Sequence, residues 1–190
     1  MSDSQLINSE YSFHLLVLGC GEIARTLVSF AQHLDCHISV CDEQAKIYSW
    51  PECVEIIEEH FNTKPFPLTT ATHAIIARGH IEDVQSVTNL LNFNASHVYL
   101  IASAARSQSV IDKATPLLNN PQVLSKLSAP AGIDLGGNNT AEICLSILAE
   151  IQWRCHHNKK SLRPLSELRE QRISTSISGQ RNKSCPGKRN

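Results

Sequence analysis

The sequence has few aromatic residues, no long apolar run and no closely spaced cysteine pair. Aromatic side chains make up 5% of its 190 residues, so aliphatic side chains must form most of the core. No segment approaches the ~18 apolar residues of a membrane span, and the first residues lack the basic start and apolar run of a signal peptide. The seven cysteines include no CxxC pair, which disfavours a structural zinc site. We therefore expect a reduced, cytoplasmic protein that does not enter a membrane.

Charge divides the chain into an acidic body and a basic C-terminal segment. Residues 158–190 carry nine Lys or Arg and two Asp or Glu, whereas residues 1–157 carry eight and sixteen. The basic segment lacks apolar periodicity, which is typical of disorder, and it has no interleaved aromatics of the kind that bind nucleic acid. We expect a loose leader at 1–12, one folded domain at 13–157 and a disordered basic tail at 158–190.

Short apolar runs alternate with helical patterns along the folded part of the chain. Strands are predicted at 13–18, 37–41, 53–57, 73–77, 97–101 and 130–135. Helices are predicted at about 23–34, 81–91, 104–118 and from 140 onward, where Asn139 and Glu142 have capping-box spacing. Strands too apolar to face water, each followed by a helix, predict an α/β fold with a doubly wound, mostly parallel Rossmann-like sheet and helices on both faces.

A glycine motif lies between the first predicted strand and the first predicted helix. Gly19 permits a tight turn, the bare backbone at Gly21 lets a phosphate approach, and Ala24 lets the helix lie close to the sheet. The helix N-terminus then offers amide groups to an anion. Asp42 follows the second strand at about the spacing of a ribose-binding carboxylate. The motif predicts a dinucleotide-type anion site; the alternative is a turn that only packs the fold.

Four further candidates fall at or near the glycine turn or predicted strand ends, where such sheets bind ligands. Cys20 lies at a helix N-terminus, which lowers a thiol pKa, although we favour its interpretation as a small buried side chain. His80 suits hydrogen bonding to a ligand or proton transfer, and equally a turn cap. Asp134 suits a ligand hydroxyl or amine, and equally a cap on the following glycine turn. Ser103 precedes the helix predicted from 104.

Residues 13–152 resemble the C-terminal Rossmann domain of the XdhC/CoxI family, the accessory factors of xanthine dehydrogenase and related molybdenum hydroxylases. The most specific part of the resemblance is APAGIDLG at 129–136, continued by TAEICLSILAEI at 140–151. The turn GCGEIA at 19–24 stands where the family has a GxGxxA turn. Asp42, His80 and Ser103 match, respectively, a strand-end aspartate, a histidine after the fourth strand and the serine of a Gly-Ser turn.

The resemblance implies a protein that binds the molybdenum cofactor, a phosphate-bearing pterin dithiolene. Family members protect this cofactor while a cysteine desulfurase adds its sulfido ligand, and then assist its insertion into the hydroxylase. The implied role is that of an accessory chaperone able to form a homodimer, rather than an enzyme with its own catalytic or metal-ligating residues. The residues expected to hold the cofactor are Gly19, Cys20, Gly21, Ala24, Asp42, His80, Ser103 and Asp134.

The chain also departs from the family pattern. The family's separate N-terminal domain has no counterpart in residues 1–12, Glu22 replaces the usual histidine, and the turns at 78–80 and 102–106 differ, the second carrying less positive charge. Two other functions therefore stay open. An NAD(P)-dependent oxidoreductase fits the glycine turn, but residues 13–157 leave no room for a substrate domain. The other is a non-catalytic nucleotide-binding interaction module.

Overall fold

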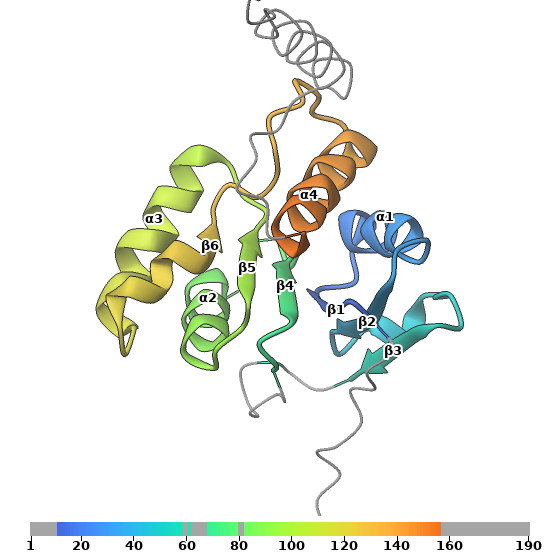
Figure 1. Ribbon diagram of the computed structural model, residues 1–190, viewed down its shortest axis with the longest axis horizontal. Coiled ribbons are helices and arrows are strands. Elements are labelled where there is room, and N and C mark those ends of the chain that lie inside the picture. Colours follow the sequence, from blue (N-terminus) through green and yellow to red (C-terminus); the bar gives the residue numbers. More distant parts are fainter. Residues whose placement is uncertain (1–10, 59–60, 62–67, 80–81, 157–190) are drawn as a thin grey trace, which may run out of the picture. The chain divides into compact units, whose positions relative to one another are not determined.

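A computed structural model describes residues 11–58, 61, 68–79 and 82–156 (Figure 1). Residues 1–10 of the predicted leader and the predicted tail lie outside the described residues. The strands are β1 (Phe13–Leu18), β2 (Cys36–Cys41), β3 (Val54–Ile57), β4 (Thr72–Ile76), β5 (His97–Leu100) and β6 (Leu127–Ser128). The α-helices are α1 (Glu22–Ala31), α2 (Asp83–Asn92), α3 (Ala104–Ala114) and α4 (Thr140–Cys155). Short 3₁₀ turns lie at Ala45–Ile47, Thr115–Leu117 and Pro121–Lys126.

The six strands form one sheet in the order β3-β2-β1-β4-β5-β6, and every neighbouring pair is parallel. This confirms the predicted Rossmann-like sheet. The order reverses direction between β1 and β4, where Leu18 aligns with Ile76. The connections on the two sides of this point run to opposite faces of the sheet. The loops that follow β1 and β4 at the carboxyl end of the sheet therefore diverge here and leave space between them. The fold therefore places the glycine turn after β1 at the switch point.

Alternate residues of β1 pack against different helix layers. Leu15 and Val17 belong to a core shared with α1 and α4, whereas Leu16 and Leu18 belong to a second core shared with α2 and α3. Figure 1 shows the two pairs of helices on either side of the sheet. Every residue of β1, β4 and β5 is buried. Burial on both faces explains why these strands are continuous apolar runs in the sequence rather than alternating ones.

Three buried histidines lie near the amino ends of the central strands, opposite the glycine turn. His14 bonds to Ser39 Oγ (2.9 Å) and to Thr72 Oγ1 (3.1 Å). His73 bonds to the Tyr99 hydroxyl (2.9 Å) and His97 to Ser128 Oγ (2.8 Å). Each histidine is at most 5% exposed. These polar pairs satisfy the rings within the apolar layers, so the histidines are structural.

Two predicted elements differ from the structure. The expected strand at 130–135 is wrong, because the last strand, β6, ends at Ser128 and Pro130 has no N–H for a ladder. Ala131 N still donates to Leu100 O of β5 (3.0 Å), but the next two amides turn to α4: Gly132 N donates to a carboxylate oxygen of Glu150 (2.8 Å) and Ile133 N to Ser146 O (3.3 Å). The helix predicted at 104–118 ends as an α-helix at Ala114, since a 3₁₀ turn containing a proline follows.

Candidate functional site

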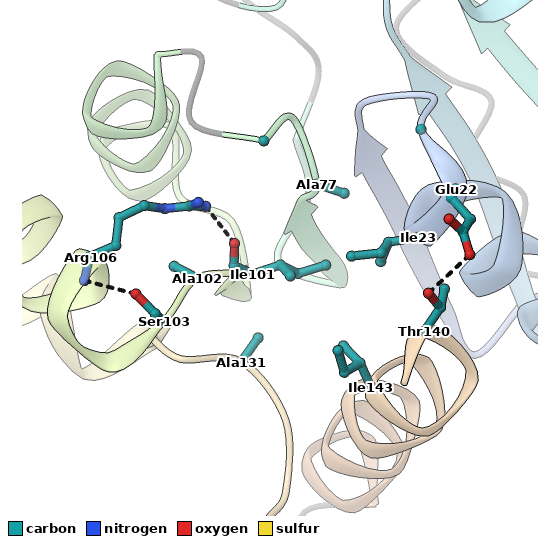
Figure 2. Close-up of a pocket in the computed structure, with 12 residues that line it drawn as sticks. Glu22, Ile23, Ala77, Ile101, Ala102, Ser103, Arg106, Ala131, Thr140 and Ile143 are labelled. Atoms are coloured by element: carbon teal, nitrogen blue, oxygen red, sulfur yellow. Dashed lines mark hydrogen bonds between the residues drawn. The ribbon is translucent and has the colours of Figure 1, made fainter. Parts of the chain in front are cut away.

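A cleft of about 650 Å³ lies at the carboxyl ends of β1, β4 and β5 (Figure 2). Its described walls are the start of α1, the loop after β4, the segment from Ile101 into α3, and the start of α4 with the loop before it. The cleft thus occupies the switch point, where doubly wound sheets bind their ligands. Its volume lies in the range of small-molecule sites.

The middle of the cleft is apolar. Ile23, Ile101 and Ile143 project into it from three different elements, and Ala77 and Ala131 add small side chains. Such walls suit the faces of a flat ring. Sequence reasoning missed these residues, because an isoleucine at a strand end or in a first helical turn looks like any core residue. Their positions could have identified them: each lies within four residues of the carboxyl end of a strand or of the start of a helix at the switch point.

Gly19 is required by its own backbone and by a neighbouring loop. Its φ is +116°, and its N–H donates to Cys41 O (3.1 Å). A Cβ at this position would lie 2.6 Å from the carbonyl oxygen of Ala77, which is backbone and cannot rotate away. Gly19 therefore lets the loops after β1 and β4 meet closely, as the motif predicts.

Gly21 is the N-cap residue of α1, and no side chain caps this helix end. Gly21 is extended (φ −67°, ψ −174°), and the helical ladder starts with Arg25 N donating to Gly21 O (3.0 Å). The amide groups of residues 22–24 therefore have no acceptor within the helix. Among the described residues, apart from Gly21 and its two chain neighbours, no atom lies within 4 Å of where a Cβ of Gly21 would be. The positive end of α1 thus faces open space on the cleft.

Two other helices begin at the cleft, and side chains cap both. Ser103 Oγ accepts from Arg106 N (3.3 Å) at the start of α3. At the start of α4, Asn139 Oδ1 accepts from Glu142 N (3.0 Å), and Glu142 Oε2 accepts from Asn139 N (3.2 Å). The capping box predicted from the sequence is confirmed. Of the three helix ends, that of α1 is left for a ligand.

The charged side chains that line the described cleft are both engaged by protein groups. Arg106 pairs with the buried carboxylate of Asp83 (Nε to Oδ2, 3.1 Å) and also donates to Ile101 O (2.6 Å). Glu22 accepts from the hydroxyl of Thr140 (3.0 Å). Because Arg106 is neutralised by a carboxylate and Thr140 is uncharged, the charge of Glu22 is not balanced by its partner. Attraction for an anion must come mainly from backbone amides.

Cys20 and Asp42 contact one another away from the described cleft lining. Burial, and after it the hydrogen bond to Asp42, raises the pKa of the Cys20 thiol to about 11. The prediction that the helix N-terminus lowers the pKa of this thiol is therefore wrong. The interpretation of Cys20 as a small buried side chain, which we favoured from the sequence, agrees with its 8% exposure. Asp42 Oδ1 also accepts from Gln44 N (2.9 Å).

The remaining predicted residues divide between the cleft, the core and the surface. Ser103 lines the cleft with Gly21, and Ala24 is fully buried against the sheet. Asp134 is exposed and its Oδ1 accepts from Gly136 N (3.0 Å), which is the turn-capping alternative. His80 lies outside the described residues. Ligand binding by any of the eight residues stays a prediction.

Two further properties concern the described part of the chain. Among residues 11–58, 61, 68–79 and 82–156, no helix combines the length and the apolar character needed to cross a bilayer. Within the same ranges, no group of three or more His, Cys, Asp or Glu side chains is arranged to hold a metal ion.

Comparison with known proteins identifies the family of the chain and a solved structure with a similar fold. Residues 15–151 match the family described as the XdhC Rossmann domain. A crystal structure from Bacillus halodurans, described as a xanthine dehydrogenase, is similar with a TM-score of 0.61 and 20% sequence identity. The similarity covers 82% of this chain and 46% of that one, so this chain spans less than half of that protein. No curated protein matches the sequence. The match over residues 15–151 shows that the chain belongs to the XdhC Rossmann-domain family.

Proposed function

We propose that the chain binds the molybdenum cofactor in the cleft and acts as an accessory protein for a xanthine dehydrogenase-type molybdenum hydroxylase. The observation that carries this proposal is the uncapped start of α1 at Gly21, which opens on an apolar cleft of about 650 Å³. An end of this kind suits a phosphate group. Membership of the XdhC family supports the accessory role.

The residues of the cleft fit such a group by their chemistry. The amides of residues 22–24 would hold the phosphate, and Ile23, Ile101 and Ile143 would cover the faces of the ring system. When bound, the cofactor supplies the metal and its dithiolene ligands, and the chain contributes binding, orientation and exclusion of water. A cysteine desulfurase and a hydroxylase are the partners that this role requires.

A nicotinamide dinucleotide is the rival ligand, and Asp42 is the residue that favours it. Asp42 follows β2, where a ribose-binding carboxylate is expected. However, its carboxylate already accepts from Gln44 N and from the Cys20 thiol. These two bonds occupy part of the acceptor capacity of the carboxylate, and Asp42 is not among the described cleft-lining residues. The molybdenum cofactor is therefore the better-supported ligand.

Calorimetric titration of the full chain distinguishes these functions. Molybdenum cofactor, NAD(H), NADP(H) and adenine nucleotides are titrated in parallel under anaerobic conditions. We expect the molybdenum cofactor to bind more tightly than any nucleotide. Tighter binding of a dinucleotide, accompanied by turnover, would establish the oxidoreductase instead. Binding of a mononucleotide alone would favour the interaction module.

The Gly21→Asp variant tests whether that binding occurs at the start of α1. A carboxylate there would occupy the open space beside the amides and repel a phosphate by about 4 kcal/mol per charge pair at 4 Å. We expect affinity to fall by roughly 100-fold or more. The matched control is Asn119→Asp, which adds the same charge at an exposed position in the loop after α3. Equal affinities in the two variants would place the ligand elsewhere.

A further inference from the structure

Glu22 poses a problem for any anion site at the start of α1. It is the first residue of the helix, directly after Gly21, and a carboxylate in a first turn is itself attracted by the helix dipole. It would therefore compete with a ligand for the amides of residues 22–24 and repel the ligand's negative charge. An anion site can persist only if something holds this carboxylate aside.

The structure shows what holds it. Thr140, the first residue of α4, donates its hydroxyl hydrogen to Glu22 Oε1 (3.0 Å) across 118 positions of sequence. In Figure 2 the Glu22 side chain turns toward Thr140, while Ile23 points into the middle of the cleft. The carboxylate therefore lies toward the N-terminus of α4, whose dipole also favours a negative charge.

The start of α4 can accept this charge without losing its own cap. Asn139 and Glu142 already form the capping box there, so the Thr140 hydroxyl is not needed to cap the helix. The described hydrogen bond of the Thr140 hydroxyl is made to a different helix and not within α4. It links the start of α4 to the start of α1.

We propose that Thr140 is a positioning residue that draws the Glu22 carboxylate toward α4 and thereby sets the anion affinity of the cleft. The proposal rests on the cleft being an anion site, as proposed above, but not on which anion it takes. Without the hydroxyl, Glu22 rotates back to its own helix and competes with the anion. Thr140 thus acts on the ligand through Glu22 and has no need to touch it.

The test measures the dissociation constant of inorganic pyrophosphate by calorimetry on the full chain. Four proteins are compared: the wild type, Thr140→Val, Glu22→Gln and the double variant. Valine matches threonine in shape and removes only the hydroxyl. We expect Thr140→Val to weaken binding roughly fivefold and Glu22→Gln to strengthen it roughly tenfold, because one unit charge near the anion is removed. The double variant should bind like Glu22→Gln alone.

The double variant separates positioning from other roles. A loss of affinity on adding Thr140→Val to Glu22→Gln, as large as in the wild type, would show direct contact or structural damage and overturn the proposal. Thr140→Ser keeps the hydroxyl and should restore wild-type affinity. No pyrophosphate binding by either the wild type or Glu22→Gln would also overturn it. Pyrophosphate binding with this pattern, but no binding of molybdenum cofactor, would support the positioning role and refute only the proposed function.

Discussion

Acidification from about pH 7 to about pH 4 is expected to unfold the protein cooperatively, through three buried histidines. Burial first, and neighbouring charges second, lower the pKa of His14 and His73 to about 4 and that of His97 to about 3. The neighbouring group is His37 for His14, and Arg154 is the first such group for His73 and His97. In the unfolded chain each would titrate near its ordinary pKa of about 6.5. The unfolded state therefore takes up protons first as the pH falls.

The stability that these neutral rings contribute is complete above about pH 6.5 and is lost as the pH falls toward the folded-state values. Each ring contributes at most about 3 to 5 kcal/mol, and the sum is comparable with the whole stability of an ordinary domain. The free energy of unfolding, measured by urea denaturation between about pH 6.5 and 5, should fall by up to about 1.4 kcal/mol per pH unit for each ring.

Replacing one ring isolates this contribution. His97→Gln keeps a partner for Ser128 Oγ but cannot take up a proton, so it should make the dependence on pH shallower by up to about 1.4 kcal/mol per unit. The matched control is His33→Gln, the same replacement at an exposed position. The same slope in His97→Gln as in the wild type would mean that protonation of His97 is not coupled to unfolding.

Gly19→Ala is expected to cost more than about 3 kcal/mol of folding stability. An alanine at φ +116° is strained wherever it lies, and here its Cβ would also approach the Ala77 carbonyl oxygen to 2.6 Å. Relief requires the loop after β1 or the loop after β4 to move. Because both loops border the cleft, ligand affinity should fall together with stability. Chemical denaturation measures the first effect and calorimetry the second.

Gly21→Ala provides the comparison within the same turn. Its φ of −67° suits any residue, and in the described part of the chain no atom beyond the two chain neighbours lies within 4 Å of the added Cβ. The cost in folding stability should therefore stay below about 1 kcal/mol. The motif requires glycine at both positions, but for different reasons. Gly19 adopts a backbone conformation and a close contact that other residues cannot adopt, whereas Gly21 leaves space for a ligand beside the backbone. Similar losses of stability in the two variants would contradict this division.

The elements that could be predicted from the sequence are those whose signal is local. The buried runs of β1 and β4 are apolar because both faces of the sheet are covered, and Asn139 and Glu142 form their capping box within a single turn. Residues 130–135 look equally strand-like, but the amides of Gly132 and Ile133 pair with Glu150 and Ser146 of α4. Hydrogen bonds to partners distant in the sequence cannot be predicted from a local sequence pattern.

The candidate site was predictable only in its backbone part. The positions of Gly19 and Gly21 follow from the motif, since the turn has few alternatives. The raised pKa of the Cys20 thiol could not be predicted, because it depends on burial and on Asp42, a residue at another strand end. The Glu22–Thr140 contact joins two helices distant in sequence. Which side chains meet across a switch point is decided by packing.

Backbone amide shifts in a nitrogen–proton correlation spectrum of the full chain, recorded during titration with molybdenum cofactor, test the central claim most directly. The account predicts that the largest changes occur at Gly21, Glu22, Ile23 and Ala24, with smaller changes at the side-chain-capped start of α4 and none near His97 at the opposite edge of the sheet. An unchanged spectrum at residues 21–24 in the presence of saturating cofactor would contradict it.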